Sequence, residues 1–85
     1  MSKVDIYTKG HCPYCHRAKA LLQKKEITFN EIEIDVMPEL RSTMIDRAKG
    51  KSTVPQIFIN DHHVGGCDDL FALEAKNQLD SLLTD

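Results

Sequence analysis

The chain has 85 residues, three cysteines and a net charge of −2. This length predicts one domain, residues 1–85, with a small core, and an odd cysteine count does not suit a disulfide-stapled secreted domain. The slight negative charge argues against a nucleic-acid partner, and because no apolar run exceeds four residues we expect neither a membrane span nor a signal peptide. The expected location is therefore the reducing cytoplasm.

The first half of the chain alternates between strand and helix patterns. β-branched and aromatic residues predict a strand over 4–8, and a proline at the first helical position precedes a helix over 13–25. Apolar and acidic side chains alternate over 29–34, which predicts a second strand with one covered face. Pro38 opens a second predicted helix, which ends at Gly50.

The second half predicts a β-hairpin followed by a helix. Strands over 56–59 and 62–64 flank a turn at 60–61, and an aspartate at 68 or 69 caps a last helix that continues to Leu83. The order β-α-β-α-β-β-α is that of an α/β chain, with a parallel unit first and an antiparallel hairpin last. We therefore predict a four-stranded mixed sheet with helices on both faces.

The clearest chemical signal is the pair of cysteines in Cys12-Pro13-Tyr14-Cys15. The pair follows a predicted strand and opens a predicted helix, a context in which C-x-x-C is typical of a dithiol redox site. The N-terminus of a helix has unpaired N–H groups that stabilise a thiolate. We therefore expect Cys12 to attack disulfides and Cys15, which lies further into the helix, to resolve the mixed disulfide.

The charges along the chain favour the same interpretation. Residues 1–25 hold six lysines and arginines against one aspartate, a net charge of +5, whereas residues 26–46 hold six acids against one arginine, a net charge of −5. Lys9 lies three residues before Cys12. A positive field there would lower the pKa of the Cys12 thiol and attract an anionic thiol partner.

A metal site is the alternative interpretation of the cysteine pair. Zinc sites usually combine two ligand pairs at regular spacing, and this sequence lacks the second spaced pair. We therefore expect no metal. The side chains that could complete such a site are His11, His16, His62, His63 and Cys67.

Three further segments carry a resemblance to a known family. The cysteine motif resembles that of the dithiol (class I) glutaredoxins, and with the other segments the resemblance covers nearly the whole chain, closest to the bacterial glutaredoxin 3 subgroup. It implies a thioredoxin-like fold and a glutathione-dependent thiol–disulfide oxidoreductase, a cytoplasmic enzyme. The other matching segments are Tyr7-Thr8-Lys9, Thr53-Val54-Pro55 and Gly65-Gly66-Cys67-Asp68-Asp69.

The resemblance also implies where glutathione binds. Thr53, Val54 and Pro55 correspond to the family's cis-proline loop, in which the Val54 backbone pairs with the cysteine of glutathione; a trans proline opening the next strand is the alternative. Lys9 corresponds to the cation for the glycine carboxylate, and Tyr14 packs along the ligand. Arg47, Lys49 and Lys51 are further candidate cations.

The glycine-rich segment corresponds to the site for the γ-glutamyl end of glutathione. Gly66 permits close approach of the ligand, and the N–H groups of Cys67 and Asp68 at a helix start suit a carboxylate. One of Asp68 and Asp69 would accept the ammonium group while the other caps the helix. For the Cys67 thiol, two interpretations stay open: a regulatory thiol, or a small buried residue.

Two other functions compete with this one. A dimer bridged by an iron–sulfur cluster would use Cys12 and glutathione thiols as ligands, and a related enzyme would be reduced by thioredoxin reductase. The expected partners are glutathione and disulfide-bonded or glutathionylated proteins, with ribonucleotide reductase as a family-level candidate. We expect a monomer, because no apolar stripe is obvious on the predicted surface.

Overall fold

The computed structural model describes residues 3–83, which form a four-stranded sheet in the order β2-β1-β3-β4. Strand β1 pairs in parallel with β2 and antiparallel with β3, and β3 pairs antiparallel with β4. This is the predicted mixed sheet. The elements are β1 (Val4–Thr8), α1 (Pro13–Lys24), β2 (Asn30–Glu33), α2 (Leu40–Arg47), β3 (Gln56–Ile59), β4 (His62–Gly65), α3 (Cys67–Ala75) and α4 (Leu79–Leu83).

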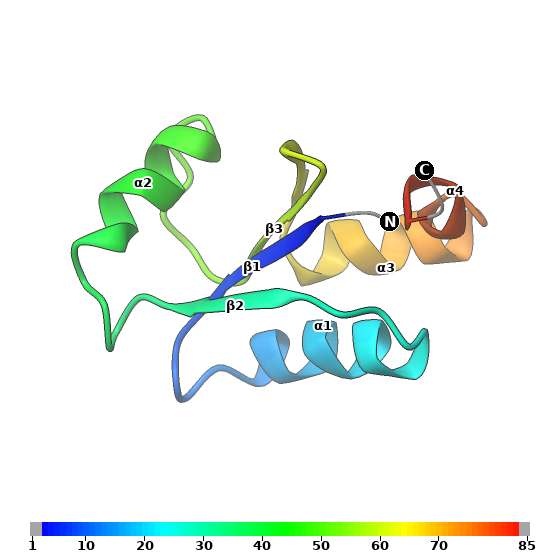
Figure 1. Ribbon diagram of the computed structural model, residues 1–85, viewed down its shortest axis with the longest axis horizontal. Helices are drawn as coiled ribbons and strands as arrows, with labels where there is room; N and C mark the ends of the chain where they lie inside the picture. The colour runs from blue at the N-terminus through cyan, green and yellow to red at the C-terminus, as the bar shows by residue number, and fades with distance from the viewer. Residues whose placement is uncertain (1–2, 84–85) are drawn as a thin grey trace.

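Helices cover both faces of the sheet, as the sequence predicts (Figure 1). Successive side chains of a strand point to opposite faces, so Ile57 and Ile59 pack against helices α1, α3 and α4 while Phe58 packs against α2. We call these sides the α1 face and the α2 face. Each face holds its own cluster of buried side chains, and the sheet lies between them.

The predicted hairpin is confirmed. Asn60 and Asp61 both have positive φ, 52° and 66°, which is the backbone of the two-residue type I′ turn that suits twisted antiparallel strands. A register shift between Ile57 and Phe58 follows in the pairing of β3 with β4. Ile57 pairs with Gly65 but Phe58 pairs with His63, so the pairing passes over Val64.

Two helix predictions need correction. The single last helix is two helices, α3 and α4, because Asn77 adopts a left-handed backbone with φ of 57°, a conformation that asparagine tolerates better than most residues. The second helix begins at Leu40 instead of Pro38, because Pro38 and Glu39 form turns. Within residues 3–83, no helix is both long enough and apolar enough to cross a bilayer.

Candidate functional site

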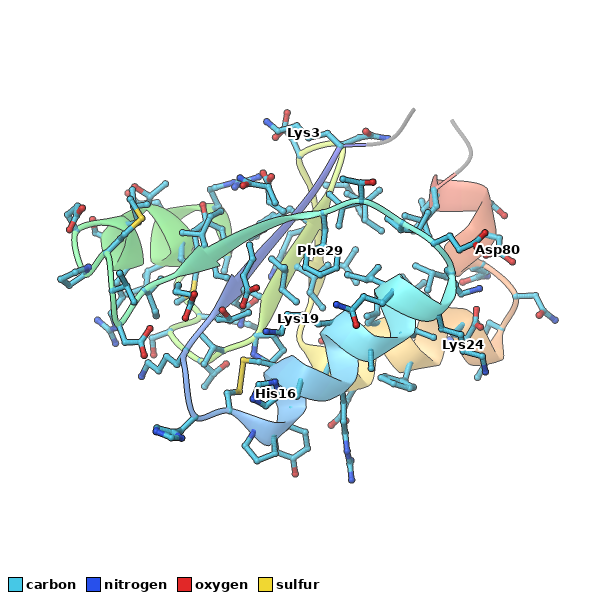
Figure 2. All side chains as sticks on the ribbon, turned by 60° about the horizontal axis from the view of Figure 1, so that its bottom comes forward. Lys3, His16, Lys19, Lys24, Phe29 and Asp80 are labelled. Atoms are coloured by element: carbon cyan, nitrogen blue, oxygen red, sulfur yellow. A yellow bond between two sulfur atoms is a disulfide. The ribbon has the colours of Figure 1, made fainter. Side chains whose placement is uncertain are left out.

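The two cysteines lie at the start of helix α1, where their sulfur atoms are joined as a disulfide (Figure 2). Cys12 has an extended backbone and immediately precedes Pro13, the first residue of the helix. The N–H of Cys15 donates to Cys12 Sγ at 3.1 Å. An N–H of the first helical turn therefore points at the sulfur predicted to carry negative charge after reduction.

The two sulfur positions differ in accessibility. Cys12 is 8% exposed, whereas Cys15 is 0% exposed. The Cα atoms lie 5.1 Å apart, so both residues belong to one turn. An incoming disulfide can reach Cys12 before it can reach Cys15.

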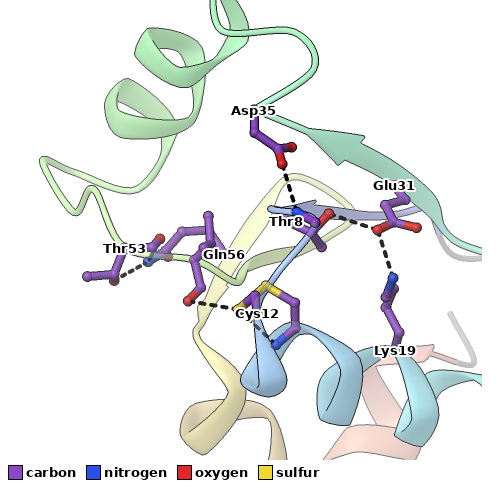
Figure 3. Close-up of a disulfide and its surroundings, with 10 residues drawn as sticks. Thr8, Cys12, Lys19, Glu31, Asp35, Thr53 and Gln56 are labelled. Carbon is purple, nitrogen blue, oxygen red and sulfur yellow. Dashed lines mark hydrogen bonds and ion pairs between the residues drawn. A yellow bond between two sulfur atoms is a disulfide. The ribbon is translucent and has the colours of Figure 1, made fainter.

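The loop that carries Cys12 is anchored to the turn that follows strand β2 (Figure 3). The N–H of Gly10 donates to Asp35 Oδ2 at 2.9 Å. This hydrogen bond is the main reason that the pKa of Asp35 lies below its ordinary value. The anchored carboxylate fixes the backbone two residues before Cys12.

A second anchor ties helix α1 to strand β2. The hydroxyl of Thr8 donates to Glu31 Oε2 at 2.8 Å, and Lys19 Nζ lies 2.9 Å from the same oxygen. Burial acts to raise the pKa of Glu31, but the hydrogen bonds from Lys19 and Thr8 outweigh it and hold the pKa below the ordinary value. The charged Glu31 thus holds α1 against the sheet beside the cysteine pair.

A hollow borders the cysteine pair. The Val54–Pro55 peptide bond is cis, as the resemblance implies, and Val54 O lies 3.8 Å from Cys12 Sγ. The sulfur therefore sits against the wall of the hollow. Its lining residues are Tyr14, Lys51, Thr53, Val54, Pro55, Gln56, Gly66, Cys67, Asp68 and Asp69.

The start of helix α3, which lies beside the cis-proline loop, forms another wall of the hollow. The N–H of Gly66 donates to Asp69 Oδ2 at 3.0 Å, so Asp69 is the aspartate that caps the helix, from inside its first turn. Gly65 has φ of 120°, and a Cβ there would overlap the Asp69 carboxylate. Asp68 is exposed and lines the hollow, so its carboxylate is accessible to a molecule bound there.

The structure therefore brings together most of the residues predicted to contact glutathione. Lys9 is exposed and is not among the lining residues, whereas Lys51, a secondary candidate, is. Arg47 is engaged elsewhere: its guanidinium lies 3.3 Å from Asp5 Oδ2 and donates to the Tyr7 hydroxyl at 2.9 Å. Of the candidate cations, Lys51 lines the hollow.

Sequence reasoning missed Gln56. The residue lines the hollow and is 1% exposed. A signal was present, since Gln56 is the single polar residue of the apolar strand Gln56–Ile59. A buried amide needs hydrogen-bond partners, and these lie in segments that the pattern of one strand does not reveal.

The third cysteine lies between the hollow and the α1 face. Cys67 is 6% exposed and belongs to the buried cluster of the α1 face. Burial raises the pKa of its thiol, and the neighbouring Asp68 raises it further, while Arg17 acts in the opposite direction. A thiol with a raised pKa is a poor nucleophile at neutral pH.

Among residues 3–83, no three His, Cys, Asp or Glu side chains gather as a metal site.

Comparison with known proteins agrees with the geometry of the cysteine pair and the hollow. A sequence model of the glutaredoxin family matches residues 4–64. Glutaredoxin 3 of Escherichia coli strain K12 is 58% identical over 83 residues, which cover 98% of this chain and 99% of that protein.

Solved structures show the same likeness. The solution structure of a glutaredoxin from Brucella melitensis is 59% identical, with a TM-score of 0.82, over 95% of this chain and 87% of that one. A buckwheat glutaredoxin–glutathione complex is 28% identical, with a TM-score of 0.88, over 98% and 77% of the two chains. The fold is thioredoxin-like, as in its structural neighbours. The chain belongs to the glutaredoxin family, the glutathione-dependent thiol–disulfide oxidoreductases.

Proposed function

We propose that Cys12 is the nucleophile of this oxidoreductase, that Cys15 is the resolving thiol, and that glutathione binds in the hollow beside them. The observation that carries the proposal is the hydrogen bond from Cys15 N–H to Cys12 Sγ at 3.1 Å. After reduction the same N–H would stabilise a thiolate on Cys12. The accessibility of Cys12 and the burial of Cys15 support the same division of roles.

The chemistry is a series of thiol–disulfide exchanges. With a glutathionylated protein, the Cys12 thiolate bonds to the glutathione sulfur and the protein thiolate leaves. A second glutathione thiolate then attacks that sulfur, which releases oxidised glutathione and restores the Cys12 thiolate. With a protein disulfide, Cys12 forms a mixed disulfide, Cys15 displaces the target, and two glutathione molecules supply the two electrons that reduce the Cys12–Cys15 disulfide.

The lining of the hollow matches the charges of glutathione. Lys51 would face the glycine carboxylate, and the N–H groups of Cys67 and Asp68 would face the γ-glutamyl carboxylate. The exposed Asp68 carboxylate would accept the ammonium group. Tyr14, which is 55% exposed, would cover the ligand. Lys9 would be a further cation near the Cys12 loop. The walls would be formed by Thr53, Val54, Pro55, Gly66 and Asp69.

The alkylation rate of reduced Cys12 as a function of pH tests the proposal. We expect a midpoint below the ~8.5 of an ordinary thiol, measured by mass spectrometry of the Cys12 peptide. Cys15→Ser should keep the reduction of glutathione mixed disulfides and lose dithiol reduction of protein disulfides, and Cys12→Ser should lose both. A midpoint at or above 8.5, or equal loss of both activities in Cys15→Ser, would contradict it.

The physiological setting belongs to the same proposal. The targets would be disulfide-bonded and glutathionylated proteins, with ribonucleotide reductase as the first to test, and the enzyme would act as a monomer in the cytoplasm. Turnover coupled to glutathione and its reductase, compared with thioredoxin reductase, identifies the reductant. Faster turnover with thioredoxin reductase would contradict the assignment of glutathione.

A further inference from the structure

Gln56 is a buried amide that faces the hollow from the start of strand β3. It lies on the α2 face, two residues before Phe58, and is 1% exposed. Its Nε2 donates to Thr53 O at 3.0 Å and to Thr53 Oγ1 at 3.2 Å. Both amide hydrogens are therefore committed to Thr53 (Figure 3).

The amide oxygen of Gln56 faces a histidine on the neighbouring strand. His63 Nε2 lies 2.7 Å from Gln56 Oε1. Because an amide oxygen only accepts hydrogen bonds, His63 Nε2 must carry the hydrogen and donate it. The side chains of Thr53, Gln56 and His63 thus form one directional chain of donors and acceptors from β4 to the wall of the hollow.

The position of His63 is fixed by packing as well as by this hydrogen bond. Its ring stacks on Phe58, with centroids 5.0 Å apart and planes 29° apart. The guanidinium carbon of Arg47 lies 4.0 Å from the centroid of the same Phe58 ring. A turn of the His63 ring would lose both the stacking and the hydrogen bond, so the imidazole holds Gln56 in one orientation.

We propose that Gln56 and His63 are positioning residues that hold Thr53 in the geometry that binds glutathione. Neither contacts the reacting sulfur atoms, so they act on the affinity for glutathione and not on the thiolate of Cys12. A wall that is fixed before binding spares the ligand the entropic cost of ordering it. The inference rests on the proposed function, because it needs glutathione to bind beside Thr53.

The test uses the equilibrium constant for forming the Cys12–glutathione mixed disulfide in the Cys15→Ser background. Protein is equilibrated in buffers of reduced and oxidised glutathione, quenched with acid and quantified by mass spectrometry. His63→Phe keeps a flat ring beside Phe58 but has no N–H. It should lower the constant about fivefold, the effect of losing roughly one hydrogen bond.

Two variants make the comparison specific. His63→Gln supplies an N–H near the place of Nε2 and should restore most of the constant. His62→Phe is the matched control, because His62 is the exposed neighbour on the same strand, where adjacent side chains point to opposite faces, and it should stay within about twofold of the parent, less than one hydrogen bond. If His63→Phe does not fold by circular dichroism, Gln56→Met replaces it: this variant removes both donors to Thr53 without adding a charge to the hollow, and it should lower the constant at least about fivefold.

The outcomes separate the inference from the proposed function. A lower constant in His63→Phe, restored in His63→Gln, with an unchanged pH midpoint of Cys12 alkylation, supports the inference. Equal constants in His63→Phe and His62→Phe, equal losses in His63→Phe and His63→Gln, or a shifted alkylation midpoint overturn it. Failure of the proposed function looks different, because the parent with an intact His63 would then form no mixed disulfide at Cys12.

Discussion

The two faces of the sheet are both buried but chemically different. The fully buried cluster of the α1 face is aliphatic apart from Cys67, with Phe29 partly buried against it, whereas the α2 face adds aromatic and polar side chains to a smaller buried cluster. On the α2 face, Arg47 and Asp5 pair near Phe58, and Gln56 reaches the hollow. The comparison indicates that the α1 face mainly supplies stability, while the α2 face combines stability with placement of the site.

The largest expected effect is on the α1 face. Leu70 is 0% exposed in its cluster, so Leu70→Ala should lower the free energy of unfolding by about 2–5 kcal/mol through lost burial and a cavity. Urea denaturation monitored by circular dichroism measures it. Phe71→Ala is the control, because Phe71 is 41% exposed. Equal losses in the two variants would contradict this view of the face.

An intermediate effect is expected from the ion pair on the α2 face. Asp5 is 5% exposed, and within residues 3–83 its Oδ1 has no hydrogen-bond partner. Arg47→Met removes the guanidinium 3.3 Å from Oδ2, and the methionine side chain, which is similar in length to the apolar stem of arginine, keeps part of the packing on Phe58. Loss of this partner, which leaves Lys3 Nζ 4.0 Å from the same oxygen, should cost about 1–3 kcal/mol in urea denaturation.

A double variant checks the cause of that loss. If the uncompensated Asp5 carboxylate is responsible, adding Asp5→Asn to Arg47→Met should recover part of the stability, and the two losses should not be additive. Strict additivity would show that Arg47 acts through its other contacts, such as the Phe58 ring and the Tyr7 hydroxyl. This cycle therefore separates the charge of the α2 face from its packing.

The smallest effect is a pH dependence that comes from His63. Burial, and then the charges of Lys51 and Lys49, lower its pKa from the ordinary value of 6.5, while Asp69 acts in the opposite direction and His62 adds to the lowering. Below pH 6.5 the unfolded chain therefore binds more protons at this residue than the folded chain does. The free energy of unfolding should fall as the pH drops from that value through the folded pKa.

Urea denaturation at several pH values between neutrality and pH ~5 measures this dependence. His63→Phe should show a shallower decline than the parent, because the titrating group is gone. His62→Phe, in which the exposed neighbour is replaced, should follow the parent more closely. A parent and a His63→Phe variant with the same slope would rule out His63 as the source.

Local patterns predicted the sheet well and the last helix less well. Residue types along the strands, the alternation over 29–34 and the Asn60-Asp61 turn were sufficient for the four strands and the hairpin, because these depend on neighbouring residues. The strand order β2-β1-β3-β4 was not predicted. The break at Asn77 was missed although asparagine is a known helix-end residue, because the leucines that follow it continue the helical spacing. The place where α3 ends at Ala75 is set by the way in which α3 and α4 both pack against the sheet.

Prediction of the site was limited by contacts between different elements of the fold. The cysteine motif and its helix start are adjacent in sequence, so their relation could be predicted. The partners of Gln56 lie three and seven residues away, on a loop and across an irregular hairpin, and no single motif links them. Arg47 was a candidate for glutathione because of its charge, but its pairing with Asp5 spans 42 residues.

The burial of Cys15 sets a limit on the lifetime of the covalent complex. A target disulfide cannot reach the fully buried Cys15, so under the proposed roles the first bond would form at Cys12. The second exchange, by the Cys15 thiolate, would then be intramolecular, and its rate would not depend on the concentration of the target or of glutathione. A target that is slow to leave is released on a timescale that the enzyme itself determines.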